Sequence, residues 1–216
     1  MTKIILYCSV TALLLSAGVY LHYAKYHNKA QSLSGPILYG ITPGGALYKI
    51  DVMSCTACPI ADFAGNGLPY DVLVLPNGDV LVQSAFGLYR YTLPNNTPIW
   101  TESNSVYAGS VLAPNGTIYL ASAFPTFGLA IYDPATNTIT YIGDWPAGMQ
   151  IAEFFYQNGV LYGFGSLSGS QVLVEVNTTN PGLSMVVYSG ISITNGGTTN
   201  NGYTTANGAS DSDMLY

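Results

Sequence analysis

One closely spaced cysteine pair, Cys55-Thr56-Ala57-Cys58, is the first place in this chain to look for chemistry. A C-x-x-C pair can form half of a zinc site or a redox centre. Zinc is disfavoured because no second pair follows and the two histidines, His22 and His27, flank an apolar N-terminal segment. A redox pair is expected at a helix N-terminus, whereas this one connects two expected strands. We therefore predict a structural disulfide between Cys55 and Cys58, with free thiols as the alternative.

Other catalytic groups are scarce, and we predict no catalytic residue. No histidine follows His27, so Ser-His-Asp and Cys-His arrangements cannot be assembled in the body of the chain. No phosphate-binding G-x-x-x-x-G-K-[ST] loop occurs either. A few carboxylates remain. Asp71 and Glu153 lie six and five residues before the Asn of two Asn-Gly steps, and Gly109 takes the corresponding place between them.

Composition narrows the class of protein. Of the 216 residues only 7% are charged, 49% are hydrophobic, and the net charge is −6. Binding to nucleic acid needs several Lys or Arg to neutralise phosphates, so no nucleic-acid partner is expected. The hydrophobic content is high enough for a folded core. The 18 tyrosines are expected mainly in strand packing, with a subset at one mouth of the fold able to stack on sugars.

The N-terminus has the layout of an export signal. Met1 to Lys3 is a short positive start, and an apolar run follows from Ile4 to Tyr20. Either this segment is cleaved near Ser16-Ala17-Gly18, or residues 4–24 remain as a hydrophobic helix that tethers the protein to a membrane. We therefore expect an exported protein that is extracellular, periplasmic or anchored at the cell surface.

The body of the chain repeats. Asn-Gly steps recur at Asn77, Asn115 and Asn158, and each precedes a run such as Leu88-Tyr89-Arg90-Tyr91. Asn-Gly between apolar runs predicts a hairpin with a type I′ turn. In the second complete unit the expected strands are 108–113, 117–122, 129–133 and 139–143. The class is therefore all-β. Four strands in a period of about 42 residues are typical of a β-propeller blade, and a sandwich or barrel is the alternative.

The pattern Pro-Asn-Gly-x-[Val/Ile]-[Leu/Tyr]-[Val/Leu], followed by Leu-Tyr-x-[Ile/Tyr], resembles the blades of NHL, YVTN and SMP-30-type propellers over residues 37–190. The resemblance implies four-stranded antiparallel blades around a central channel. In SMP-30-type propellers, acidic residues near the start of a blade's first strand hold a divalent metal. Asp71 and Glu153 are therefore candidate ligands of calcium or magnesium. The alternative is a carboxylate hydrogen-bonded to the backbone, in which case no cofactor is needed.

The expected organisation is a signal peptide or anchor over 1–24, a linker over 25–35, blades over 36–190, and a polar Asn/Gly/Thr-rich loop with the start of a further blade over 191–216. About four blades can be counted. Propellers usually close with 4–8 blades, but here the first unit is partial and the last has only begun. We therefore expect an incomplete propeller whose C-terminal blades are missing; the alternatives are that two chains combine in an oligomer, or that a four-bladed ring closes imperfectly.

Two functions fit these observations. The favoured one is a non-catalytic binding or scaffold module at the cell surface, with a protein or glycan ligand, because catalytic groups are scarce. The alternative is a metal-dependent lactonase or lyase of the SMP-30 type, or a fragment of a larger propeller. Because propeller blades occur in binding proteins and enzymes alike, the fold does not choose between them.

Overall fold

The computed structural model describes residues 20–23, 37–42, 44–51, 54, 56–190, 210–211 and 214–215. In this part of the chain, four antiparallel sheets of four strands follow one another, and we call them blades 1 to 4. Within each blade the strands pair in chain order, so every blade is a meander. Two 3-10 turns, η1 (Ala64–Asn66) and η2 (Pro181–Leu183), lie in connections.

The strands of the blades have the following bounds. Blades 1 and 2 consist of β1 (Tyr20–Tyr23), β2 (Ile37–Ile41), β3 (Ala46–Asp51), β4 (Thr56–Asp62), and β5 (Pro69–Val74), β6 (Val80–Ser84), β7 (Gly87–Tyr91), β8 (Trp100–Glu102). Blades 3 and 4 consist of β9 (Val106–Leu112), β10 (Ile118–Phe124), β11 (Gly128–Asp133), β12 (Thr138–Asp144), and β13 (Met149–Gln157), β14 (Val160–Leu167), β15 (Ser170–Glu175), β16 (Met185–Ser189). A further pair is β17 (Ser210–Asp211) with β18 (Met214–Leu215).

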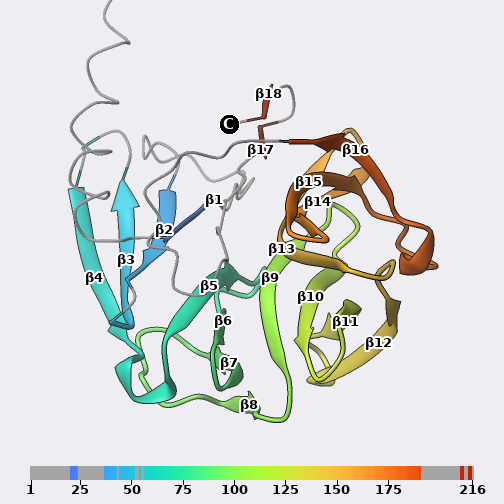
Figure 1. Cartoon of the computed structure of the whole chain (residues 1–216). Coiled ribbons are helices and arrows are strands. Elements are labelled where there is room, and N and C mark those ends of the chain that lie inside the picture. Colours follow the sequence, from blue (N-terminus) through green and yellow to red (C-terminus); the bar gives the residue numbers. More distant parts are fainter. Residues whose placement is uncertain are drawn as a thin grey trace, which may run out of the picture.

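The blades follow one another around a common centre (Figure 1), which confirms the predicted fold class, an all-β propeller with about four blades. The first strand of each blade lies inside and the fourth outside, and β1, β5, β9 and β13 neighbour one another in series. The four strands predicted for the second complete unit match β9 to β12 to within two residues at every boundary. The N-terminal helix predicted before the blades lies outside the described residues, apart from Tyr20–Tyr23.

The hairpin turns differ from the prediction in a way that proline explains. In the first two Asn-Gly hairpins only the glycine has a positive φ, +89° at Gly78 and +88° at Gly116. Pro76 and Pro114 precede these steps, and proline favours the first central position of a type I turn. The glycine then takes the left-handed position after the turn. The third hairpin has no proline, and there both Asn158 (51°) and Gly159 (81°) have positive φ, as a type I′ turn requires.

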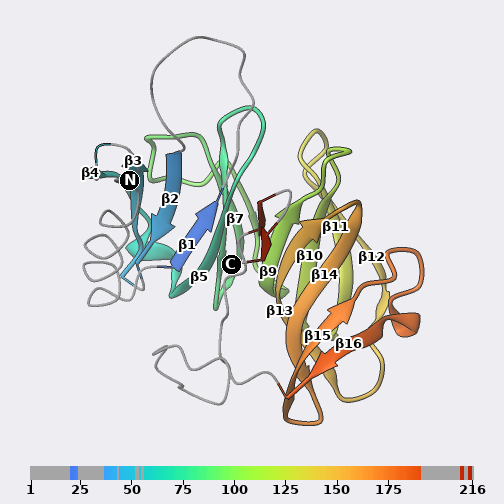
Figure 2. The ribbon, with the colours of Figure 1, turned by 90° about the horizontal axis from the view of Figure 1, so that it is seen from above.

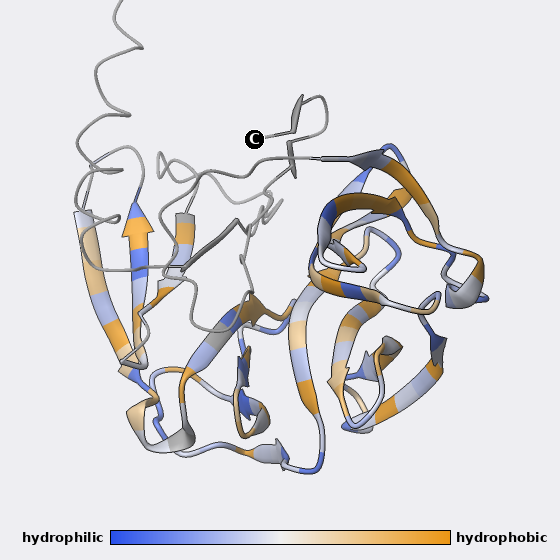
Figure 3. Ribbon diagram, in the orientation of Figure 1, coloured by the Kyte–Doolittle hydropathy of each residue, from blue (hydrophilic) through white to orange (hydrophobic). Residues whose placement is uncertain are grey.

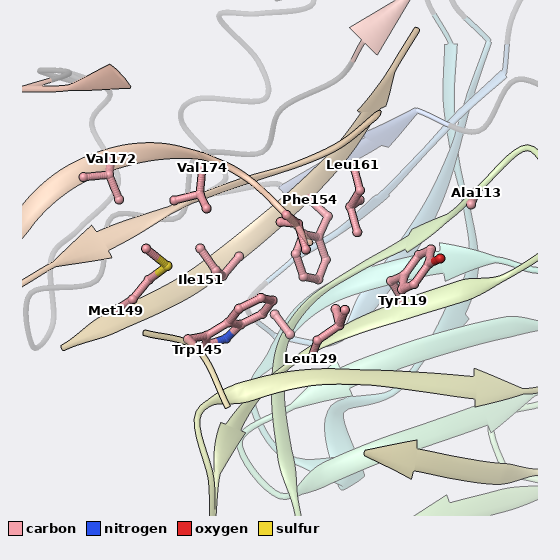
Figure 4. Close-up of a cluster of buried hydrophobic side chains, with 12 residues drawn as sticks. Ala113, Tyr119, Leu129, Trp145, Met149, Ile151, Phe154, Leu161, Val172 and Val174 are labelled. Atoms are coloured by element: carbon pink, nitrogen blue, oxygen red, sulfur yellow. The ribbon is translucent and has the colours of Figure 1, made fainter. Parts of the chain in front are cut away.

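Three hydrophobic cores lie between the four blades, because residues on the two faces of each strand alternate and each face packs on a neighbouring blade. Alternating apolar and polar positions are visible along the strands in Figure 3. The core between blades 3 and 4 (Figure 4) places Trp145, Ile151 and Phe154 against Leu129. The other two cores lie between blades 1 and 2 and between blades 2 and 3.

Corresponding leucines show how the blades stack. Leu47, Leu88 and Leu129 hold the same place in the third strand of blades 1, 2 and 3, and each is 0% exposed in the core shared with the next blade. Leu173 holds that place in blade 4 and is only half-buried. On the side of blade 4 where a next blade would pack, β17 is the strand of the described part of the chain that contacts β13. Figure 2 shows blade 4 with its four strands side by side and β17–β18 near the centre.

The N-terminal segment differs from the prediction at its end. Tyr20–Tyr23 were assigned to a signal peptide or anchor over 1–24, but in the structure they form β1, antiparallel to β2, with Tyr20 opposite Ile41 and Tyr23 opposite Leu38. The rest of the segment, including the proposed cleavage site, lies outside the described residues. Within the described ranges, no helix is long and apolar enough to span a membrane.

The predicted disulfide between Cys55 and Cys58 is not supported. Cys58 is a free, exposed thiol. The prediction placed the motif in a connection between strands, whereas Cys58 lies inside strand β4, opposite Lys49 of β3. Backbone pairing within a regular strand therefore fixes this cysteine, without any help from a cross-link. Cys55 lies outside the described residues.

Candidate functional site

The two candidate carboxylates occupy equivalent places in blades 2 and 4. Asp71 of β5 pairs with Gln83 of β6, and Glu153 of β13 pairs with Phe164 of β14. Both belong to inner strands and are buried, with exposed fractions of 2% and 3%. The inner strand between them, β9, packs against both β5 and β13. The fold thus brings together two acids that are far apart in the sequence.

Asp71 joins blade 2 to blade 3 through hydrogen bonds. Its Oδ2 accepts from Gln83 Nε2 at 3.0 Å, from Ser110 Oγ at 3.0 Å and from Ser110 N at 3.2 Å. Its Oδ1 accepts from the backbone N–H of Val72 at 2.8 Å. Because Ser110 belongs to β9, the carboxylate ties the inner strands of neighbouring blades together.

Glu153 lies in a less polar environment. Its Oε1 accepts one hydrogen bond from the backbone N–H of Phe154 at 3.1 Å. Burial raises the pKa of Glu153 well above its ordinary value; the negative charge of Asp71 raises it further, and the Phe154 N–H lowers it. Both causes that raise the pKa act against the ionised form of Glu153, because burial and a neighbouring negative charge each disfavour a second carboxylate.

These groups are a poor fit to the divalent metal that the resemblance implies. Asp71 accepts four hydrogen bonds from the protein, so N–H and O–H hydrogens point at the lone pairs that a cation would need. Gln83 Oε1 is buried and has no hydrogen-bond partner, which leaves one amide oxygen available. Among the described residues no group of three or more His, Cys, Asp or Glu is placed to hold a metal ion.

Gly109 explains how the strands around the pair approach so closely. A Cβ at this position would lie 2.5 Å from the carbonyl oxygen of Ala152 and 2.8 Å from Cα of Glu153. Any side chain would therefore push β9 away from β13.

We expect Gly109→Ala to lower the free energy of unfolding by about 1–3 kcal/mol, as overpacking in a close-packed interior does. Urea unfolding followed by circular dichroism measures the change. Gly65→Ala is the control, because a Cβ at Gly65 would meet nothing within 4 Å. Equal stability of the two variants would show that β9 and β13 can separate at no cost.

A second feature is an aromatic face at one end of the blades. In a four-stranded meander, the connection from second to third strand and the connection to the next blade lie at the same end. Exposed apolar side chains gather in or beside these connections: Leu68 (62%), Phe86 (64%), Phe124 (60%) and Phe127 (40%). The opposite end carries the polar turns around Asn77 and Asn115 and also the exposed side chains of Ile99 and Leu183. The first end differs in presenting the exposed rings of Phe86, Phe124 and Phe127.

This aromatic face contains a groove of about 420 Å³ between blades 2 and 3. Its lining comes from the β6–β7 hairpin, the β8–β9 connection and the end of β10, and consists of Ala85, Phe86, Ser103, Asn104, Ser105, Val106 and Phe124. None of these side chains carries a charge. A subset of the tyrosines was predicted to form such a surface, whereas Phe86 and Phe124 were not predicted to take part. The available signal was a large apolar residue at a hairpin position, where polar residues are usual.

Many solved structures resemble this chain, among them the following three. The hydrazine synthase of Kuenenia stuttgartiensis matches at 13% identity over 77% of this chain and 52% of that chain, with a TM-score of 0.51. A streptogramin B lyase structure matches at 14% identity over 78% and 58%, also with a TM-score of 0.51. The WD40 β-propeller domain of Doa1 matches at 18% identity over 65% and 47%, with a TM-score of 0.48.

The fold is of the β-propeller type. This chain spans about half the length of the chains it resembles. No protein-family model matches the chain, and no curated protein matches its sequence. Identities this low concern the fold alone. The function of this propeller must therefore be argued from its own residues.

The propeller also contains a polar latch that sequence analysis did not find. Arg90, the single arginine of the chain, is 8% exposed. It pairs with Asp79 of its own blade, with Nε and Nη2 at 2.9 and 2.8 Å from Oδ2. Its Nη1 donates across the blade boundary to Asn137 Oδ1 at 2.9 Å and to the carbonyl oxygen of Pro134. The latch thus ties β7 to the β11–β12 turn.

Proposed function

We propose that this chain is a non-catalytic binding module of an exported propeller, and that its ligand binds on the aromatic face. The observation that carries the proposal is the groove between Phe86 and Phe124, where large apolar side chains are exposed together at one end of the fold. Exposed apolar surface costs solubility, and where it gathers beside a concave site it marks binding surfaces.

The buried acids support a binding role. Asp71 connects blade 2 to blade 3 through Ser110, and Glu153 accepts a hydrogen bond from the backbone N–H of the next residue in its own strand, Phe154. The contacts of Asp71 are those of a group that holds inner strands together. The apolar N-terminal run supports export, with residues 4–24 as a signal peptide or tether, and the blade motifs support an NHL, YVTN or SMP-30-type ancestry.

Binding through this face is tested on the surface of intact cells of the source organism with labelled protein. We expect saturable binding that falls at least tenfold in Phe86→Ala/Phe124→Ala, because both residues line the groove and both side chains are exposed. Ile99→Ala is the matched control, since Ile99 is 56% exposed and lies in the β7–β8 connection at the opposite end. Binding that ignores the double variant would place the ligand elsewhere.

A metal-dependent lactonase or lyase is the alternative, and Gln83 Oε1, buried and without a partner, is the observation in its favour. The two functions predict different melting temperatures in the presence of calcium, magnesium or EDTA. A ligand that binds only the folded state raises the melting temperature. We expect the same melting temperature under all three conditions. A rise with either metal that vanishes in Asp71→Ala would establish a metal site and favour the enzyme.

A further inference from the structure

The ring of Phe86 lies against the backbone at Gly67, although most of it is exposed. Gly67 lies directly beneath it: a Cβ on Gly67 would be 2.3 Å from Cδ2 and 2.9 Å from Cε2 of Phe86. Gly67 has a φ of +90°, which a residue with a side chain rarely adopts. The ring therefore packs against bare backbone on one side and offers its remaining surface to the groove.

Hydrogen bonds hold the same hairpin. The backbone N–H of Phe86 donates to Ser84 Oγ at 3.1 Å, and the hydroxyl of Tyr89 donates to the carbonyl oxygen of Phe86 at 3.4 Å. Gly87 lies against the backbone of Glu102, where a Cβ would approach the Glu102 carbonyl oxygen to 2.0 Å. A site whose aromatic wall is ordered before the ligand arrives loses little entropy on binding.

Strand pairing and a hydrogen bond hold the other side of the groove. Phe124 ends strand β10 and pairs with Val106 of β9, whose side chain lines the groove. The hydroxyl of Ser122 donates to the carbonyl oxygen of Thr126 at 2.8 Å, which closes the hairpin that follows Phe124. Phe86 and Phe124 thus line the groove from neighbouring blades.

The rim of the groove is polar and uncharged. Ser103, Asn104 and Ser105 follow one another along it, and hydroxyl and amide groups both donate and accept hydrogen bonds. The backbone N–H of Asn104 donates to Glu102 Oε1 at 2.7 Å, which shapes this turn and places a carboxylate near it. An anionic ligand would meet that carboxylate and no cation among the lining residues.

We propose that this groove binds a neutral polysaccharide chain, a specificity that rests on the binding function proposed above. A sugar ring has C–H faces that pack on aromatic rings and an edge of hydroxyl groups that both donate and accept. Phe86 and Phe124 match the first, and Ser103, Asn104 and Ser105 match the second. A groove of about 420 Å³ that is open to solvent has room for one sugar ring. An apolar peptide side chain would instead favour an enclosed pocket without this polar rim.

The test is calorimetric titration of the full chain with four neutral hexasaccharides (cellohexaose, chitohexaose, maltohexaose and mannohexaose) and, for comparison, a heparin hexasaccharide. We expect at least one neutral probe to bind and the heparin probe not to bind. Phe86→Ala and Phe124→Ala should each weaken binding at least tenfold, Phe86→Tyr should retain it because the ring remains, and Ile99→Ala should leave it unchanged.

The proposal is overturned when no neutral hexasaccharide binds, or when binding persists in both alanine variants. A second measurement, of cell-surface binding, distinguishes failure of the polysaccharide proposal from failure of the binding function on which it rests. Cell-surface binding that requires Phe86 and Phe124 but survives periodate oxidation of the cell-surface sugars would retain the binding module and assign it a protein ligand. If the wild-type protein binds neither a neutral hexasaccharide nor the cell surface, both proposals are wrong. Circular dichroism of each variant confirms that the blades remain folded.

Discussion

Replacing Arg90 with methionine is expected to lower the free energy of unfolding by about 3 kcal/mol. Breaking a buried ion pair by removing one partner leaves the other charge without compensation, and such changes typically cost about 3–5 kcal/mol. Arg90 and Asp79 have side-chain exposures of 10% and 8%, and Arg90 also donates across the blade boundary. Methionine fills the volume of the aliphatic stem, so the loss reports on the guanidinium contacts. Equilibrium urea unfolding measures the change.

The control for this variant is Lys49→Met, because Lys49 holds the corresponding place in the third strand of blade 1 and is exposed. Loss of an exposed cation should change stability by less than about 0.5 kcal/mol. A double-mutant cycle with Asp79→Asn then isolates the coupling between the two charges. Equal effects of Arg90→Met and Lys49→Met would show that the latch contributes nothing.

The stability that the Arg90–Asp79 latch contributes should decrease at acid pH. Burial raises the pKa of Asp79, but hydrogen bonds from Thr92 and Asn77 and the ion pair with Arg90 outweigh it, so the pKa lies below its ordinary value of 3.8. A carboxyl group whose pKa is lowered on folding stabilises the fold above its unfolded pKa and loses that contribution as the pH falls through the folded value. The difference in stability between the wild type and Arg90→Met should therefore narrow below about pH 4.

Glu153→Gln is expected to raise the free energy of unfolding of the propeller at pH 8. The pKa of Glu153 is raised on folding, by burial first and by the Asp71 charge second. Below its unfolded pKa, 4.5, the group is neutral in both states. As the pH rises from there toward the folded pKa, the unfolded state ionises and the folded state does not, so stability falls. Glutamine keeps the shape and cannot ionise.

The measurement is the free energy of unfolding between pH 4 and pH 9 for the wild type and two variants. The wild type should lose stability as the pH rises, while Glu153→Gln should show a flatter profile. Glu175→Gln is the control, because Glu175 lies in the same blade and is only half-buried. A steeper loss of stability in Glu153→Gln than in the wild type would mean that the glutamate is ionised and paired in the folded state.

The repeat could be predicted from the sequence because the same turn residues recur once in each repeat. Pro76-Asn77-Gly78 and Pro114-Asn115-Gly116 mark equivalent hairpins, and the strands on either side follow from them. The pairing of Asp71 with Ser110 was not readable, because it depends on how closely inner strands of different blades approach. The same holds for Arg90 and Asn137, which are neighbours only after two blades have packed.

The aromatic face was missed for a different physical reason. Phe86 and Phe124 have the residue type of a core position, and only their place at the ends of strands makes them exposed. The place of the Phe86 ring depends on Gly67, a residue in the connection before β5, whose lack of a side chain has a consequence only in three dimensions. The fate of Tyr20–Tyr23 was hidden for a similar reason: an apolar run reads alike as an anchor or as a strand until its pairing with β2 is seen.

One comparison tests the central claim, that this propeller binds a ligand through the aromatic face while its buried carboxyl pair is structural. Phe86→Ala/Phe124→Ala and Asp71→Asn/Glu153→Gln are measured side by side in the same cell-surface binding assay, at a temperature where both remain folded. We predict that the aromatic variant loses binding at least tenfold and that the carboxyl variant binds like the wild type. Loss of binding in the carboxyl variant alone would contradict this account and place the functional site at Asp71 and Glu153.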